Sequence, residues 1–423
     1  MKPTKKNQAL IWLLLSLCVS AIAWFYAHQI LDPWADARDA QKGGLKAQMG
    51  DIYPRWVGAR ELLIYRHNPY GADVSHEIQM AYYGHIVTEE ESRTRVVDEQ
   101  RFVYPVYVVF LLAPTIHTDF ATVRRWAPFA LGALAGLSAL LCIGLLDWSL
   151  PWAMIVAVVL FTLASPQIGQ GIRHQQFALL VGCLLFAGAW CVHKGHLASG
   201  GVLLALSTIK PQMALFPLVW FLIWTIGEWR PRWRLLASFG SALGVLVIGG
   251  AILLPSWIRD FISGMAAYRK YFPTTSILRL LFGDWLGIAL SSVVIIWVLI
   301  YGWSRRKAGG DSRSFASTFA AFLMVTVITF PLFTPFNQVL LILPALLVVQ
   351  EWARLPKVSR LAFAAVICWP WIASFALLLW RLPVNPANRI PVVPAIASSL
   401  LPLLLPVVLF MRKSDVLTQV KGA

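Results

Sequence analysis

The run QALIWLLLSLCVSAIAWFYA, residues 8–27, carries no charged side chain and decides the fold class. An α-helix that crosses the hydrocarbon of a bilayer needs about 20 mainly apolar residues. Three lysines, Lys2, Lys5 and Lys6, precede the run, so it is similar to a signal peptide. Because the run is long for the apolar part of a signal peptide and further apolar runs follow it, we predict an uncleaved signal anchor with a cytoplasmic N-terminus.

The composition extends this interpretation to the whole chain. Of 423 residues, 58% are hydrophobic, only 13% are charged, and 20 are tryptophan, which excludes an ordinary water-soluble protein. The net charge of +16 suits basic cytoplasmic loops beside anionic lipid better than nucleic-acid binding. The five cysteines lie in apolar segments without metal-ligand spacing, so they indicate small buried side chains and no disulfide framework.

The apolar runs predict an all-α polytopic membrane protein, a single transmembrane domain over residues 1–423 with about twelve spans. After the first helix we expect spans near 127–146, 152–166, 177–193, 197–210, 212–228, 236–254, 285–303, 314–331, 337–350, 360–380 and 391–411. Several are short around Lys210 and Asn337, as expected of helices that stop at a buried polar site.

The apolar stretch 102–115 leaves the topology open, because it holds two prolines and is short for a span. If it does not cross, the short cytoplasmic loops and the tails hold 17 Lys and Arg against 8 in the short external loops. If it crosses, the counts become 13 inside and 14 outside. The positive-inside rule favours the first arrangement. We therefore predict a re-entrant or surface helix near 102–115 and both termini in the cytoplasm.

This topology places one long external loop at residues 28–126, which we expect to contain juxtamembrane helices, and it gathers the unusual polar segments on one face of the membrane. Asp51 lies in this loop, near Tyr53, Arg55 and Arg60. A carboxylate there could act as a general base, and it could equally cap the helix expected over 54–66 or form an ion pair. Outside this loop the only acids on the external side are Asp260 and Asp284.

A second group of candidates suits an anionic phosphate. Lys210 ends a short apolar span beside a proline, where a buried ammonium is costly unless an anion meets it; a lysine that snorkels to the interface is the alternative. Arg173 and His174 lie in the neighbouring external loop, and Tyr104 precedes the helix near 102–115. The chain has no Gly-rich phosphate loop, no HExxH and no GxSxG, which argues against the common nucleotide-binding and hydrolase classes.

These motifs, in this order, resemble those of the bacterial polyprenyl-phosphate-mannose-dependent α-mannosyltransferases, membrane enzymes of the GT-C superfamily. Asp51 followed by Asn68-Pro69-Tyr70 is similar to their opening D-x-x-x-Y…G-x-(D/N)-P-Y. Phe102-Val103-Tyr104-Pro105 resembles F-x-Y-P-P, with Val106 replacing the second proline. Two segments are similar to G-Q-x-N without its asparagine, one with Gln170 and one with Gln175 and Gln176; Ser207 to Gln212 resembles the lysine-proline turn, and Thr334 to Gln338 the late polar turn.

The resemblance implies an inverting transfer of a hexose, mannose first, from a polyprenyl-phosphate donor to a glycan or glycolipid acceptor. It implies a multi-pass protein of the inner (plasma) membrane with an external, periplasmic site. Asp51 would be the catalytic base, and Lys210, with Arg173 or His174, would bind the donor phosphate. The remaining substrate-binding candidates are Tyr53, Arg55, Arg60, Tyr104, Gln170, Gln175 and Asn337.

Several points stay open in the sequence. No cofactor is implied, and a solitary Asp51 argues against a dedicated divalent metal. We expect membrane lipid as a partner and no nucleic acid. A transporter or flippase is the rival class, although the sequence shows no internal repeat; a GT-C transferase that uses another sugar is the closer rival.

Overall fold

The computed structural model describes residues 5–33, 36–37, 49–88, 90–91, 99–271, 275–330, 334–365 and 367–369. Every regular element in these ranges is helical, which confirms the all-α class. The first part contains α1 (Lys5–Phe25), α4 (Tyr53–Arg60), α5 (Ala72–Tyr83), α7 (Val108–Leu112), α8 (Phe120–Leu145), α9 (Trp152–Ala164), α10 (Pro166–Arg173) and α11 (Ala178–His193). The second contains α12 (Leu197–Leu206), α13 (Pro211–Gly227), α14 (Trp229–Leu253), α15 (Trp257–Tyr271), α16 (Ile277–Phe282), α17 (Asp284–Arg305), α18 (Arg313–Thr329) and α19 (Ile342–Gln350).

Four of the described helices are long and apolar enough to cross a membrane, namely Asn7–Ile30, Phe120–Leu145, Trp229–Leu253 and Asp284–Arg305. Helices α9 and α10 meet at an angle of 61° and would make a fifth span if counted together. The prediction of about twelve spans is therefore not confirmed. Five predicted spans form apolar helices of only 10–17 residues, shorter than the ~20 residues that a bilayer requires. The last two predicted spans fall partly or wholly outside the described residues.

The short apolar helices form the core, and the long ones surround it. Nearly every side chain of α18 is buried, and its phenylalanines pack against Trp220 and Phe221 of α13. By contrast, α14 exposes large apolar side chains, with Ile252 at 77% exposure. A long helix with so much exposed hydrocarbon is expected to face lipid.

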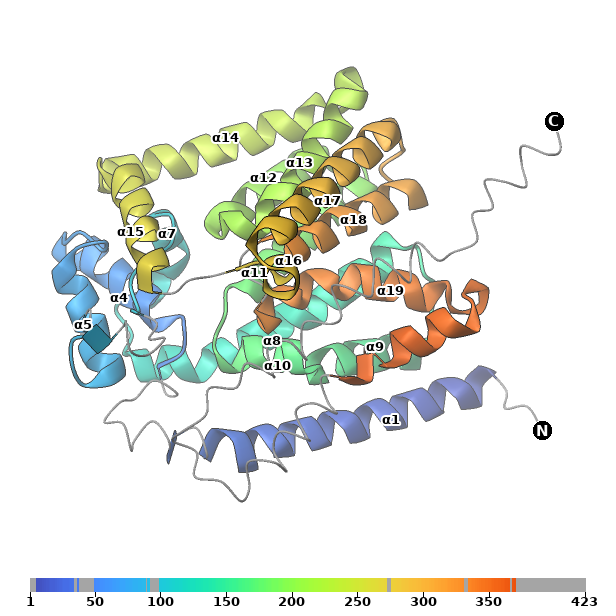
Figure 1. Ribbon diagram of the computed structural model, residues 1–423, viewed down its shortest axis with the longest axis horizontal. Helices are drawn as coiled ribbons and strands as arrows, with labels where there is room; N and C mark the ends of the chain where they lie inside the picture. Colours follow the sequence, from blue (N-terminus) through green and yellow to red (C-terminus); the bar gives the residue numbers. More distant parts are fainter. Residues whose placement is uncertain are drawn as a thin grey trace.

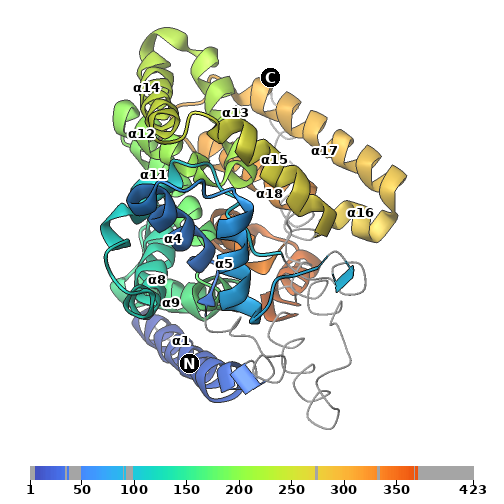
Figure 2. The ribbon, with the colours of Figure 1, turned by 90° about the vertical axis from the view of Figure 1, so that its left-hand side faces the viewer.

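The helices of the long first loop gather at one end of the molecule. In Figure 1, α4, α5 and α7 lie together at the end where α14 meets α15, and the view from that side shows α4 and α5 in front with α15 beside them (Figure 2). The described part of this loop does contain helices, and α4 with the π-helical segment Glu61–Tyr65 that follows it covers most of the predicted 54–66. Stretch 102–115 forms only the five-residue α7 and a short 3-10 turn, Ala113–Thr115, and α7 packs on α4.

Helices α12 and α14 pack closely because α12 carries glycines at the crossing. A Cβ atom on Gly201 would overlap the Ser238 side chain and the Leu235 carbonyl of α14. Small residues let helix backbones approach in this way inside membranes. The crossing fixes α14 against the core, and so fixes where α15 begins.

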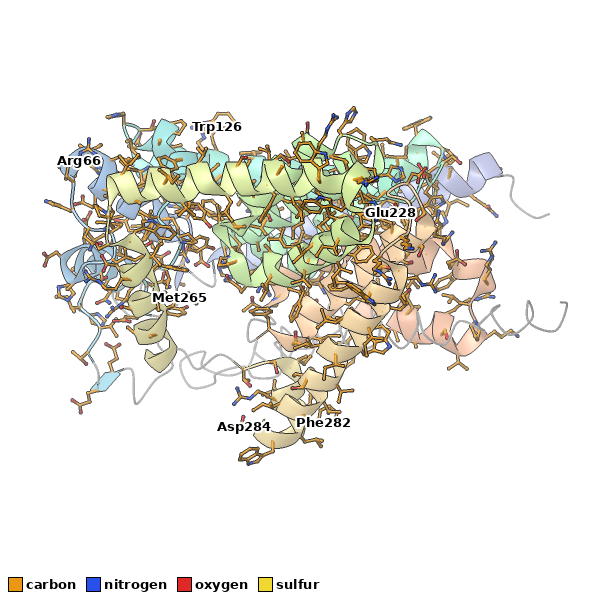
Figure 3. All side chains as sticks on the ribbon, turned by 90° about the horizontal axis from the view of Figure 1, so that it is seen from above. Arg66, Trp126, Glu228, Met265, Phe282 and Asp284 are labelled. Carbon is orange, nitrogen blue, oxygen red and sulfur yellow. The ribbon has the colours of Figure 1, made fainter. Side chains whose placement is uncertain are left out.

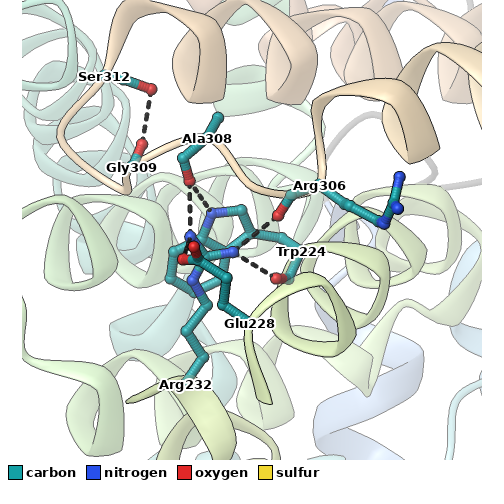
Figure 4. A network of polar contacts seen from close by, with 7 residues as sticks. All are labelled: Trp224, Glu228, Arg232, Arg306, Ala308, Gly309 and Ser312. Carbon is teal, nitrogen blue, oxygen red and sulfur yellow. Dashed lines mark hydrogen bonds and ion pairs between the residues drawn. The ribbon is translucent and has the colours of Figure 1, made fainter. Parts of the chain in front are cut away.

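Arg232 joins the turn between α13 and α14 to the loop between α17 and α18 (Figure 4). Its guanidinium donates to the carbonyl oxygens of Trp224 at 2.6 Å, Arg306 at 2.7 Å and Ala308 at 2.9 Å, and pairs with Glu228. It also lies 3.9 Å from the centroid of the Trp224 ring. A buried charge that satisfies three carbonyls at helix ends holds these segments in register.

We expect Arg232→Lys to lower the melting temperature of the detergent-solubilised protein, because an ammonium cannot reproduce the planar fork that reaches several carbonyls. The loss of these bonds is worth on the order of 3 kcal/mol. Arg230→Lys is the matched control, since Arg230 is exposed on the same turn. Equal melting temperatures for both variants would show that the Arg232 contacts do not stabilise the fold.

The topology remains a prediction that labelling can test. His117, exposed between α7 and α8, should face the external side if residues 102–115 do not cross the membrane. In a chain freed of its five native cysteines, His117→Cys should react with a membrane-impermeant maleimide in intact cells. Labelling only after the membrane is opened would place it in the cytoplasm and reject this topology.

Candidate active site

Asp51 lies in the turn just before α4, at the end of the molecule where the first-loop helices gather. Its backbone N–H donates to the His174 carbonyl at 2.8 Å, which ties this turn to the segment between α10 and α11. The N-cap residue of α4 is Ile52, and no side chain caps the helix. The half-buried Asp51 carboxylate makes no hydrogen bond or ion pair with any described residue. Among the described residues, the Asp51 side chain therefore neither caps α4 nor forms an ion pair, which are the two structural roles that the sequence leaves open.

Arg55 follows Asp51 by one helical turn and lies between it and Tyr104. Its Nη1 donates to the Asp51 carbonyl oxygen at 2.7 Å, and its guanidinium carbon lies 4.6 Å from the Tyr104 ring centroid. The charges of Arg55 and Asp51 lie within electrostatic reach of each other. Among the described atoms, the buried Nε of Arg55 has no acceptor. A guanidinium with a spare donor can still bind an oxygen of a ligand.

Lys210 is the buried cation of the site. It lies in the break between the 3-10 turn Ser207–Ile209 and α13, and is only 5% exposed. Its Nζ donates to Asn337 Oδ1 at 3.1 Å and to Gln176 Oε1 at 3.4 Å, and lies 5.0 Å from the Phe336 ring centroid. No described carboxylate pairs with it, although the charges of Asp51 and Arg55 reach it.

The segment 102–107 connects the first loop to the Lys210 turn. Phe102 packs so closely on Gly58 of α4 that a Cβ atom there would overlap its ring. The Tyr104 carbonyl accepts a hydrogen bond from the Tyr70 hydroxyl at 2.6 Å. The Tyr107 hydroxyl contacts Thr208 Oγ1 at 2.9 Å and donates to the Thr208 carbonyl at 3.0 Å. Segment 102–107 and the Lys210 turn are thereby held in contact, although they are far apart in sequence.

Asn68 fastens the first loop to α15. Its Nδ2 donates to Asp260 Oδ2 at 2.9 Å, and its Oδ1 accepts from the Tyr70 backbone N–H at 3.0 Å. Ser256 Oγ donates to the same Asp260 oxygen at 2.6 Å. The hydrogen bonds from Ser256 and then Asn68 lower the pKa of the Asp260 carboxyl, so it stays ionised near neutral pH. The sequence predicts that Asp260 lies on the external side, but it does not indicate this anchoring contact.

Other predicted residues take different places. Arg173 forms an ion pair with Asp32 beyond α1, and the side chain of His174 is exposed. Tyr53 packs in an aromatic cluster with Trp56, Tyr82 and Phe120, while Arg60 lies over the Trp56 and Tyr65 rings.

Of the two glutamine segments, the second contacts Lys210, through Gln176. Gln176 is not among the substrate-binding candidates that we predict from the sequence. Gln175 donates instead to the Arg124 carbonyl at 3.2 Å, and Gln170 is half-buried on α10. Asp284 pairs with Arg279, and Figure 3 shows it well away from Met265 of α15. Within the described ranges, no group of three or more His, Cys, Asp or Glu side chains is placed to hold a metal ion.

Comparison with known families decides the class of protein. The sequence model of glycosyltransferase family 87 matches residues 102–335, more than half of the chain. The chain belongs to glycosyltransferase family 87. The matched range includes Tyr104, Gln176 and Lys210, whereas Asp51 precedes it. With its apolar helices, the protein is a membrane glycosyltransferase of this family. No curated protein matches the chain.

We expect Asn337→Leu to destabilise the protein, because the buried Lys210 ammonium loses its nearest acceptor. A hydrogen bond to a charged group is worth about 1.5–3 kcal/mol. Replacing Lys210 as well, in Asn337→Leu with Lys210→Met, should restore much of the melting temperature, because no unpaired charge is left. Additive losses in the double variant would show that the two side chains do not interact energetically.

Proposed function

We propose that this family 87 enzyme transfers a hexose, mannose in the simplest case, from a polyprenyl-phosphate donor to a glycan or glycolipid acceptor at the external membrane surface. The observation that carries the proposal is the Asp51 carboxylate, which is half-buried, has no bonding partner among the described residues, and lies within electrostatic reach of Arg55 and Lys210. A base beside cations suits a reaction in which a hydroxyl loses a proton and a phosphate leaves.

In the proposed reaction, the acceptor hydroxyl oxygen attacks the anomeric carbon of the donor sugar. The bond between that carbon and the phosphate oxygen breaks, and its electron pair leaves with the polyprenyl phosphate. Asp51 takes the proton of the attacking hydroxyl, so charge and atoms balance. Attack from the face opposite the phosphate inverts the configuration of the anomeric carbon, and a β-linked donor yields an α-linked product.

Lys210 is the proposed cation for the leaving phosphate, with Arg55 as its neighbour on the acceptor side. A buried ammonium without an ion pair is costly, and an anionic ligand relieves that cost. Asn337, Gln176 and the Phe336 ring hold the ammonium in one place before the donor arrives. Because Arg173 already pairs with Asp32, its role in phosphate binding would require it to leave that partner.

Lys210→Met tests the phosphate contact. We expect donor binding to weaken by at least about tenfold, because a charge-assisted contact is lost. The melting temperature of the donor-free protein should change little, because removal of a buried charge offsets the hydrogen bonds that the Asn337 and Gln176 oxygens lose. The measurement is a titration of the purified variant with polyprenyl-phosphate mannose. Parental affinity would make Lys210 a structural lysine only.

Asp51→Asn tests the base. Positioned proton transfer is typically worth ~10²–10⁴ in rate, and we expect a loss of that size in radiolabel transfer from polyprenyl-phosphate mannose. Thermal stability should change little, because the Asp51 side chain contacts no described partner. Asp73→Asn, an exposed acid on α5, is the matched control and should keep activity.

Near-parental transfer by Asp51→Asn would contradict the assignment, most clearly if the variant were also less stable. Movement of a labelled substrate into vesicles, with no transferred sugar in any acceptor, would instead support the rival class of transporter or flippase.

A further inference from the structure

A cleft of about 510 Å³ opens between the start of α12 and the start of α14. Leu197 and Ser199 of α12 line it together with His196, the residue before that helix, and the opposite wall consists of Arg230, Trp233 and Arg234 of α14. It lies at the opposite end of α12 from Lys210, so it is separate from the candidate active site. The family assignment and the proposed reaction give this cleft no role.

Two guanidinium groups line this cleft without a counter-ion from the part of the chain that the structure describes. Arg230 and Arg234 are one helical turn apart on α14 and both are exposed. Among the described residues, neither side chain has a hydrogen-bond or ion-pair partner. Arg232, between them in sequence, is buried and forms an ion pair with Glu228 (Figure 4). Like charges at this spacing repel each other, and an anion between them removes that penalty.

The other wall of the cleft is also favourable to negative charge. His196 supplies a third basic side chain, and α12 begins beside it with no side chain capping its first N–H groups. The first turn of a helix carries a partial positive charge, which adds to the field of the two arginines. Guanidinium groups bind phosphate oxygens through paired N–H donors, so a phosphate is the anion that fits this chemistry best.

The position of the cleft indicates where that phosphate comes from. Helix α14 is one of the candidate membrane spans, and the cleft lies at its first turn, the end at which Figure 3 labels Glu228. Trp229 and Trp233 are 54% and 46% exposed on the same turns. Exposed tryptophans at the end of a span lie at the depth of lipid headgroups. At this depth the phosphates of lipid headgroups surround the protein, so we take a lipid and not a free ion as the source of the phosphate.

We propose that this cleft is a binding site for the headgroup of an anionic phospholipid, with the lipid phosphate held between Arg230 and Arg234. The acyl chains would lie along the exposed apolar face of α14, where Val245 and Ile248 are among the most exposed side chains. The occupied site would hold the first turns of α12 and α14 together, at the end of the molecule remote from Asp51.

The test is native mass spectrometry of the full-length protein in detergent, titrated with phosphatidylglycerol and, separately, with phosphatidylcholine. We expect the parent to bind phosphatidylglycerol more tightly than phosphatidylcholine. The double variant Arg230→Gln with Arg234→Gln should weaken phosphatidylglycerol binding by at least about tenfold. Its melting temperature in detergent without added lipid should match that of the parent, because both side chains are exposed.

The matched control removes two charges elsewhere, in Arg305→Gln with Lys307→Gln at the end of α17, outside the cleft. It should keep parental binding of phosphatidylglycerol. Equal weakening in both double variants would show a general effect of surface charge and overturn the site. So would equal affinity of the parent for both lipids. Displacement of the lipid by glycerol phosphate at the same concentration would show a site for free phosphate and overturn the assignment to a lipid.

Discussion

The buried ammonium of Lys210 is the constraint on which the site depends. An ammonium in a protein interior is tolerated only where oxygen atoms or an anion replace its lost water. Here two amide oxygens, from Asn337 and Gln176, come from segments 127 and 34 residues away. The chain must therefore bring the α10–α11 turn and the late polar turn to the break before α13. The helices on either side of that break are short because they end at this polar centre.

The rest of the site is built outward from that centre by hydrogen bonds and by close packing. The Tyr107 hydroxyl donates to the Thr208 carbonyl, which joins segment 102–107 to the Lys210 turn. The Tyr70 hydroxyl donates to the Tyr104 carbonyl, which joins the same segment to the first loop. Asn68 then joins the loop to Asp260 on α15. Each contact links segments distant in sequence, so the position of the Asp51 turn follows from several separate bonds. The proposed base, Asp51, and the proposed phosphate-binding cation, Lys210, come from different segments and can be held in one geometry in this way.

The sequence predicts the helical class, the helix of the first loop and the breaks at Lys210 and Asn337, because apolar runs and isolated polar residues within them are local signals. It does not predict the number of spans, since a run such as 197–210 has the composition of a span but ends too early to cross alone. The sequence also does not predict that Gln176 contacts Lys210, because it gives no reason to prefer one of two adjacent glutamines. The backbone turn at Gln175, which has a φ of 53°, decides where each side chain points. The Asn68 to Asp260 bond spans 192 residues and leaves no local signal.

The central claim is that Asp51 and Lys210 act on opposite sides of one reaction centre: we propose that Asp51 takes the proton of the acceptor hydroxyl beside the donor sugar, and that Lys210 binds the phosphate of the lipid-linked donor. The most direct measurement is a cryo-electron microscopy structure of the Asp51→Asn protein in nanodiscs with polyprenyl-phosphate mannose. We expect density for the sugar beside residue 51 and for the phosphate within hydrogen-bonding distance of Lys210 Nζ. Density for the sugar phosphate at any other place, with the Lys210 ammonium bound only to Asn337 and Gln176, would contradict the claim.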